Sequence, residues 1–180
     1  LYMYRESSTR GIGLMKSSDG GTTWNVMPST GDWAYVTDLL IRKESGINVI
    51  YAGVVSGLYK GTLHGSLPTD GLYRSVDQGE SWTQVLPLIP GENRPYAPSD
   101  IEVSADGAKI FVGTTYRGDD RAGASCILSS TDGATWSVMD TYYNRLSIPE
   151  SWTHNGFQYK YPGRVMLAKA PSNPDVLYAA

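Results

Sequence analysis

Short apolar segments alternate with polar, glycine-containing turns along the whole chain. Asp38–Ile41 and Val49–Gly53 form one pair of such segments, Asp100–Val103 and Ile110–Gly113 a second, and Arg164–Leu167 and Val176–Ala179 a third. Runs of this length and composition are typical of β-strands. No stretch sustains the period of an amphipathic helix. The pattern therefore predicts an all-β chain.

A second motif recurs between these strand pairs, at residues 17–24, 75–82 and 130–136, with one residue fewer in the last copy. Its members are Ser17, Asp19, Gly21 and Trp24, then Ser75, Asp77, Gly79 and Trp82, and finally Ser130, Asp132, Gly133 and Trp136. An apolar run precedes each copy, and a short strand around Val26, Val85 or Val138 follows it. Each repeat therefore contains four short strands, A to D, with the motif between C and D.

A repeated four-stranded antiparallel unit of roughly 55–60 residues is typical of propeller blades. We expect residues 1–180 to form a single β-propeller fragment with a partial blade at about 1–33, blades at about 34–97 and 98–162, and the start of another at 163–180. These are about three repeats, fewer than the roughly four to eight blades that close a ring. We therefore expect the chain to be a piece of a longer one, with its remaining blades outside this sequence.

The Ser-x-Asp-x-Gly-x-Thr-Trp segments resemble Asp-boxes, the bacterial neuraminidase (BNR) repeats of sialidases, sortilin-type receptors and reducing-end xyloglucanases. The run Pro171–Ala179, after Gly163-Arg164-Val165, is similar to the A–B hairpin of the xyloglucanase and sortilin-like branch. The resemblance implies four-stranded antiparallel blades whose boxes lie away from the active site. The Arg-Ile-Pro motif of the sialidase branch does not occur. No catalytic residue of either glycosidase group can be carried over to a numbered position.

The box residues suit a structural task. An aspartate before a tight turn accepts hydrogen bonds from backbone N–H groups further along, a glycine supplies positive φ, and the indole buries a large face between sheets. A calcium or sugar contact by Asp19, Asp77 and Asp132 is the alternative. Each box offers one carboxylate, whereas calcium takes about six to eight oxygens. The scaffold interpretation is preferred, with no metal and no cofactor expected.

Long connections on one rim, between strands B and C and between D and A, carry the candidate binding residues. Ten residues are expected to gather there: Trp33, Tyr35, Tyr59, Arg94, Tyr96, Tyr116, Arg117, Trp152, His154 and Tyr159. Flat aromatic faces beside hydrogen-bonding groups suit sugar rings, and Tyr, Trp and Arg equally suit protein interfaces. A purely structural role, in which the rings pin the loops to the sheet, stays open. Solvent-exposed Trp33 or Trp152 beside paired acids would favour glycan stacking, and burial of both would favour a scaffold.

Glycoside hydrolysis needs two carboxylates on either side of the scissile bond. Glu150, in the longest loop beside Trp152, and the adjacent Asp119 and Asp120 are weak candidates for such acids. Because Arg117 and Arg121 flank the last two, a solvated charge cluster is the preferred alternative for them. Whether the chain is a glycoside hydrolase stays open at this point.

Composition narrows the function classes. The chain has 15 Lys and Arg against 18 Asp and Glu, a net charge of −3, which gives no support to a nucleic-acid binder. No apolar run approaches the roughly 18 residues of a membrane span, and the single Cys126 excludes an intrachain disulfide. We expect a secreted or cell-surface protein that recognises or processes glycans through its aromatic rim. The alternatives are a non-enzymatic, sortilin-like protein-binding module and a structural part of a surface or secretion assembly.

Overall fold

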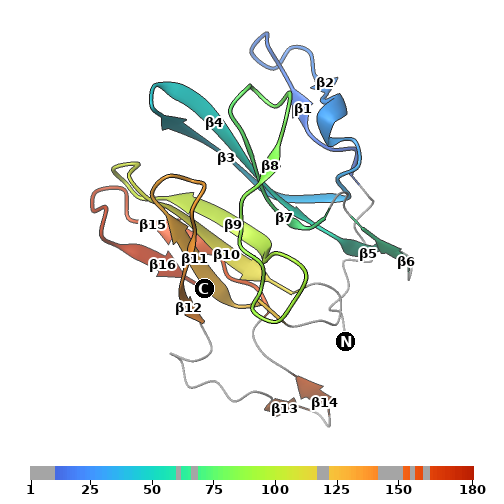
Figure 1. Ribbon diagram of the computed structural model, residues 1–180, viewed down its shortest axis with the longest axis vertical. Coiled ribbons are helices and arrows are strands. Elements are labelled where there is room, and N and C mark those ends of the chain that lie inside the picture. Colours follow the sequence, from blue (N-terminus) through green and yellow to red (C-terminus); the bar gives the residue numbers. More distant parts are fainter. Residues whose placement is uncertain are drawn as a thin grey trace.

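Two complete four-stranded antiparallel sheets form the centre of the structure (Figure 1), a computed structural model that describes residues 11–59, 62–65, 69–116, 122–141, 152–154, 157–159 and 163–180. The first sheet has the order β3 (Tyr35–Glu44), β4 (Ile47–Val55), β7 (Gly71–Ser75) and β8 (Thr83–Gln84). The second has β9 (Ala97–Val103), β10 (Ile110–Thr115), β11 (Cys126–Ser130) and β12 (Ser137–Thr141) in chain order. The predicted all-β fold of four-stranded antiparallel units is confirmed.

Two-stranded sheets flank these units in the positions that the repeat predicts. β1 (Met15–Lys16) and β2 (Asn25–Val26) form a C–D pair that a 3₁₀ turn, Pro28–Thr30, follows. β15 (Leu167–Lys169) and β16 (Leu177–Ala179) form an A–B pair. Two small hairpins in the long connections were not predicted: β5 (Gly57–Tyr59) with β6 (Thr62–His64), and β13 (Trp152–His154) with β14 (Phe157–Tyr159).

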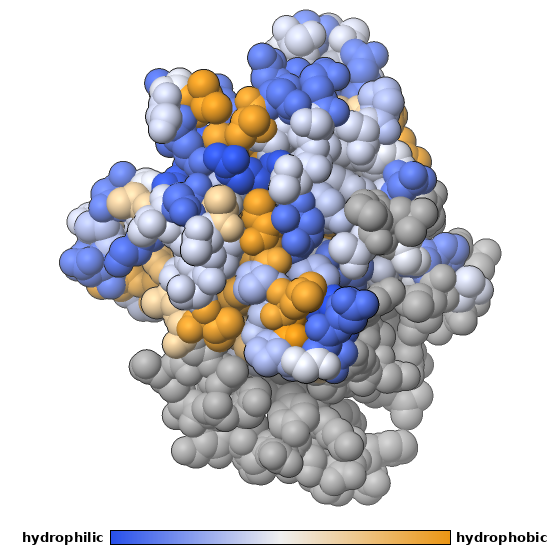
Figure 2. Space-filling view, in the orientation of Figure 1, coloured by the Kyte–Doolittle hydropathy of each residue, from blue (hydrophilic) through white to orange (hydrophobic). Residues whose placement is uncertain are grey.

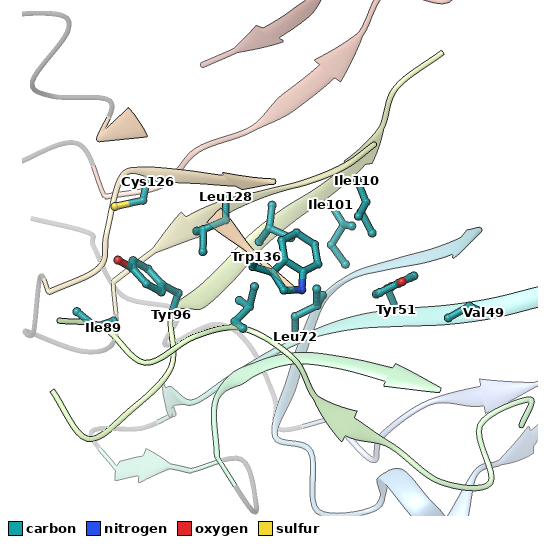
Figure 3. Packing of buried hydrophobic residues seen from close by; sticks show 12 residues of the cluster. Val49, Tyr51, Leu72, Ile89, Tyr96, Ile101, Ile110, Cys126, Leu128 and Trp136 are labelled. Carbon is teal, nitrogen blue, oxygen red and sulfur yellow. The ribbon is translucent and has the colours of Figure 1, made fainter. Parts of the chain in front are cut away.

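The main hydrophobic core lies between the two complete sheets (Figure 3). Tyr51 and Leu72 enter it from the first sheet, and Ile110, Leu128 and Trp136 enter it from the second. β10 is buried along its whole length, because neighbouring sheets cover both of its faces. This explains why the inner strands read as continuous apolar runs and not as strict alternations.

Smaller cores repeat the arrangement at the two flanking sheets. Trp33 and Tyr73 pack with Leu14 and Trp82 between β1–β2 and the first complete sheet. A third cluster joins Phe111 of β10 to Val165, Leu167 and their neighbours at β15–β16. Each sheet thus packs face to face on the next, as blades do.

Antiparallel order places the connections at two ends of each sheet. The A–B turn of the first sheet is two residues long, and its Ser45 (φ 46°) and Gly46 (φ 90°) have the positive φ that such a turn demands. The box between β7 and β8 lies at the same end. The connections 56–70 and 85–96 lie at the other end, which is the loop rim that the sequence predicts.

An apolar groove of about 590 Å³ separates β1 from the β3–β4 hairpin. Figure 2 shows apolar side chains between this hairpin and the loop from β7 to β8, and Ile41, Ile47 and Val76 are about half or more exposed in this region. Leu39 is 48% exposed here, whereas Ile101, its counterpart in the next sheet, is 6% exposed. The difference arises because β3 and β4 cover Ile101, while no inner strand among the described residues covers Leu39.

Candidate functional site

The box turns are closed by hydrogen bonds that their own serines and aspartates make. In the second box the Ser75 hydroxyl donates to Asp77 (2.7 Å) and accepts from the Gly79 N–H (2.8 Å). Asp77 also accepts from the backbone N–H (3.0 Å) and hydroxyl (2.5 Å) of Ser81. The first box repeats the pattern with Ser17, Asp19 and Thr23. The predicted capping of the turn by an aspartate is confirmed.

These hydrogen bonds stabilise the ionised carboxylates. The Thr23 hydroxyl, with help from its N–H and from Ser17, lowers the pKa of Asp19 to about 2. Ser81 lowers the pKa of Asp77 in the same way, and the Thr135 N–H lowers that of Asp132. The box glycines have φ of 90° (Gly21), 91° (Gly79) and 69° (Gly133), as predicted. In the part of the chain that the structure describes, no group of three or more His, Cys, Asp or Glu side chains is placed to hold a metal ion.

The box tryptophans differ in burial, although Trp82 and Trp136 both face the preceding sheet. Trp136 is 9% exposed in the main core, Trp82 is half-buried against Trp33, and Trp24 is 57% exposed. The expectation of burial between sheets is thus correct for Trp136, partly correct for Trp82 and wrong for Trp24. The described residues include no sheet ahead of β1–β2, so nothing among them covers Trp24.

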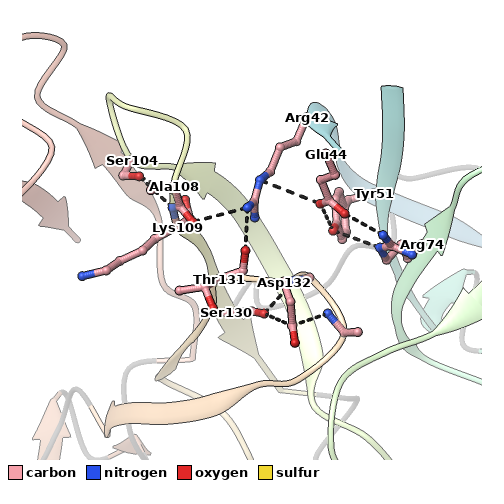
Figure 4. A network of polar contacts seen from close by, with 12 residues as sticks. Arg42, Glu44, Tyr51, Arg74, Ser104, Ala108, Lys109, Ser130, Thr131 and Asp132 are labelled. Atoms are coloured by element: carbon pink, nitrogen blue, oxygen red, sulfur yellow. Dashed lines mark hydrogen bonds and ion pairs between the residues drawn. The ribbon is translucent and has the colours of Figure 1, made fainter. Parts of the chain in front are cut away.

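A polar network at the box end joins the two complete sheets (Figure 4). Arg42 donates to the backbone carbonyls of Thr131 (2.7 Å) and Ala108 (3.3 Å) in the second sheet. Glu44 pairs with Arg74 at 2.6 Å and accepts a hydrogen bond from the Tyr51 hydroxyl. Burial, reinforced by that bond, raises the pKa of Tyr51 to about 12. This network was not predicted from the sequence, because its members come from five separate strands and turns.

Two of the predicted rim aromatics lie in the cores and not on the surface. Trp33 is 3% exposed and lies between sheets, and Tyr96 is 4% exposed beside Ile89 and Cys126. Burial also raises the pKa of Tyr96. The expectation that these rings gather in solvent at the loop rim is corrected. They hold the connections to the sheets, which is the structural alternative. Cys126 is buried in β11, as its apolar surroundings predict.

Three other predicted residues reach the loop rim. Arg94 donates to the Ala122 carbonyl at 3.3 Å and lies 3.9 Å from Glu92, so it ties two loops together. The Tyr116 N–H donates to Gly163 at 3.2 Å, and its side chain is half-buried. The ring of Tyr35 packs directly against Gly57, so closely that a Cβ at this position would clash with the ring.

A small cavity of about 200 Å³ opens where the inner strands begin. Tyr35, Thr37, Ser99 and Arg164 supply its polar lining. The Tyr35 hydroxyl is buried there and has no hydrogen-bond partner in the described part of the chain. Neither Ser99, which directly precedes the predicted strand Asp100–Val103, nor Arg164, the first residue of the predicted strand Arg164–Leu167, was predicted to line a cavity.

The remaining candidates fall partly or wholly outside the described residues. Glu150, Asp119, Asp120 and Arg117 lie outside them, as do the side chains of Tyr59, Trp152, His154 and Tyr159. The β13–β14 backbone sets Trp152 opposite Tyr159, and His154 opposite Phe157. Since positions two apart in a strand share a face, this register assigns all four residues to one face of the hairpin.

A larger cavity, of about 640 Å³, lies between the segment that follows β2 and the β7–β8 side of the first complete sheet. It is lined by Ser29, Asp32, Trp33, Tyr73, Glu80, Ser81 and Trp82. Trp33, which was assigned to a loop rim, therefore contributes to a cavity between sheets. The segment that carries it bonds to the stretch before β1, since the Gly11 N–H donates to the Ala34 carbonyl at 2.8 Å.

No protein-family model matches the chain. The chain is 25% identical over 185 residues to a probable oligoxyloglucan-reducing end-specific xyloglucanase from Neosartorya fischeri. The matched region covers 94% of this chain and 21% of that protein. The crystal structure of a GH74 enzyme from Niastella koreensis matches with a TM-score of 0.53 and 20% identity, over 92% of this chain and 21% of that one. The chain thus spans about a fifth of each, and its fold is the four-stranded antiparallel architecture of a GH74 β-propeller.

Proposed function

We propose that this chain is part of a secreted or cell-surface Asp-box β-propeller that recognises or processes glycans through its loop rim. The register of the β13–β14 hairpin carries the proposal, because it assigns Trp152, His154, Phe157 and Tyr159 to one face. Aromatic rings offer large apolar faces with polar edges, which suit the C–H faces and hydroxyls of sugars. The similarity to a protein named as a xyloglucanase supports a glycan of the β-glucan type.

Further support comes from the boxes. Their serine–aspartate closure recurs in three turns, and the sequence resemblance associates such turns with sialidases, xyloglucanases and sortilin-type receptors. The described region contains no helix with the length and apolarity needed to cross a membrane. Extracellular placement is proposed from the resemblance.

The binding test uses the whole chain with xyloglucan oligosaccharides in isothermal titration calorimetry. We expect measurable binding that weakens at least tenfold in the double variant Trp152→Ala/Tyr159→Ala. Thr153→Ala, between the two on the alternate position of β13, is the matched control and should bind as the parent does. Absence of binding to xyloglucan and to other β-glucans would contradict glycan recognition at this rim.

A processing role is tested separately. Glu150, Asp119 and Asp120 are the proposed acids, and Glu150 is the first to test. If the rim hydrolyses glycosidic bonds, Glu150→Gln should abolish release of reducing ends from xyloglucan oligosaccharides and leave their binding intact. If the parent chain binds these oligosaccharides but does not hydrolyse them, the result supports glycan recognition and contradicts a catalytic role.

A further inference from the structure

The cavity beside Trp82 has aromatic walls whose positions are fixed. The Trp33 and Trp82 rings lie 4.9 Å apart at 68°, and Trp33 and Tyr73 lie 5.1 Å apart at 39°. The Trp82 indole N–H donates to the Gly79 carbonyl (3.1 Å) and to the Ser29 hydroxyl (3.3 Å). A ligand entering this cavity would therefore meet a preorganised aromatic surface, so little side-chain entropy would be lost on binding.

The polar lining of the cavity carries negative charge. Asp32 and Glu80 are exposed carboxylates at its mouth, and the described residues that line it include no lysine, arginine or histidine. Within the described residues, neither acid forms an ion pair. Two carboxylates beside aromatic faces favour a cation over a neutral or anionic group.

Glu80 is not required by the turn that carries it. The corresponding residues of the other boxes are Thr22 and Ala134, so the turn closes with a hydroxyl, a carboxylate or a methyl group at this position. Thr22 uses its hydroxyl to bond to the Asp19 carbonyl at 3.0 Å. The Glu80 carboxylate is thus left available to a ligand.

We propose that this cavity binds a primary ammonium group, carried by an aminosugar or by a lysine side chain. The ammonium lies against the Trp82 ring, and Asp32 and Glu80 supply the countercharge. The volume of about 640 Å³ accommodates a sugar ring or an extended alkyl chain. The proposal is independent of the loop rim, because the residues that carry it, Asp32, Glu80 and Trp82, are not among those proposed to bind glycans at the rim.

The experiment follows tryptophan fluorescence of the whole chain during titration with paired probes. A glucosamine hexamer is compared with the N-acetylglucosamine hexamer, and a tri-lysine peptide is compared with the same peptide acetylated on its lysines. We expect at least one amine-bearing probe to bind at least tenfold more tightly than its acetylated partner, and to bind more weakly as salt rises. Whichever amine binds identifies the source of the ammonium. Equal binding of the acetylated and free forms, or binding of neither amine, would overturn the proposal.

Variants assign the binding to this cavity. Asp32→Asn/Glu80→Gln removes both charges with little change in shape and should weaken amine binding at least tenfold. Glu92→Gln, an exposed acid outside the cavity, is the matched control and should have no effect. Binding of xyloglucan oligosaccharides to the parent chain is measured alongside, so failure at the loop rim and failure here are distinguishable. Unchanged amine binding in the Asp32→Asn/Glu80→Gln variant would refute the assignment.

Discussion

The carboxylate of Asp38 accepts a hydrogen bond from the backbone N–H of Ile101 at 2.7 Å, across the boundary between two sheets. Asp100 repeats this relationship with the Leu167 N–H at 2.6 Å. The preceding hydroxyls extend both links, because Thr37 donates to Pro98 (3.0 Å) and Ser99 donates to Val165 (2.7 Å). A hydroxyl–aspartate dipeptide near the start of β3 and of β9 thus satisfies backbone groups at the edge of the next inner strand.

Removing one of these links should destabilise the pairing of the sheets. Asp38→Ala leaves the Ile101 N–H without its acceptor, and we expect a loss of about 1–3 kcal/mol in the free energy of unfolding. Asp38→Asn, which keeps an acceptor oxygen, should lose less. Urea unfolding followed by circular dichroism measures both. Asp175→Ala, at an exposed turn position, is the control, and a loss no larger than the control's would show that the link contributes nothing.

Acid should weaken the box turns. The pKa of Asp19 is lowered to about 2 from its ordinary 3.8, so its ionised form favours the folded state. This contribution is complete above the unfolded pKa and is lost as pH falls from about 4 to about 2. Asp19→Asn should therefore show a shallower loss of stability over that interval than the parent. Urea midpoints measured between pH 6 and pH 2.5 make the comparison, and identical slopes would contradict the coupling.

The pKa of Asp100 is shifted in the opposite direction from that of Asp19. Desolvation raises the pKa of this carboxyl, despite the hydrogen bond from Leu167. Its ionisation therefore opposes folding as pH rises through the carboxyl range. Comparing the parent with Asp19→Asn cancels this contribution, because Asp100 is present in both proteins.

The glycines of the boxes are predicted to tolerate alanine unequally. Gly20 (φ 71°) has open space where a Cβ would lie, whereas at Gly133 (φ 69°) that atom would overlap the Tyr51 hydroxyl. Gly20→Ala should cost about 1–2 kcal/mol, from backbone strain alone. Gly133→Ala should cost about 1–3 kcal/mol more, since Tyr51 must also move away from Glu44. Thermal unfolding of the two variants tests this, and equal losses would mean that the contact is not tight.

The strand order and the box turns were predictable because local patterns encode them. A serine and an aspartate two residues apart, followed by a glycine, contain the whole hydrogen-bond set of the turn, as Ser75, Asp77 and Gly79 illustrate. The repeat then orders the strands, because consecutive short strands joined by tight turns form a meander. Cys126 was placed correctly for the same reason, since its burial follows from its strand.

Contacts between sheets were not predictable from such patterns. Trp33 lies in a connection by sequence, yet it is 3% exposed, because backbone hydrogen bonds from Met27 to Leu14 and from Gly11 to Ala34 hold the segment 27–34 beside residues 11–14 and carry the indole into the interface. Arg42 reaches the carbonyl of Thr131 only through the angle between two sheets, which no local spacing encodes. One signal was present and missed: the dipeptides Thr37-Asp38 and Ser99-Asp100 occupy the same place in successive repeats.

The box tryptophans should differ in their contribution to the free energy of unfolding, because they differ in burial. Trp136 is 9% exposed in the core between the complete sheets, so Trp136→Ala should cost about 3–5 kcal/mol. Trp24→Ala removes a ring that is 57% exposed and should cost well under half as much. The indole N–H of Trp136 is buried and has no hydrogen-bond partner among the described residues, whereas that of Trp24 donates to the Gly21 carbonyl at 3.0 Å. Trp136→Phe therefore gives up no hydrogen bond and should recover much of the loss that alanine causes. Urea unfolding of the three variants measures this order, and a Trp24→Ala loss as large as that of Trp136→Ala would mean that both indoles are covered equally in solution.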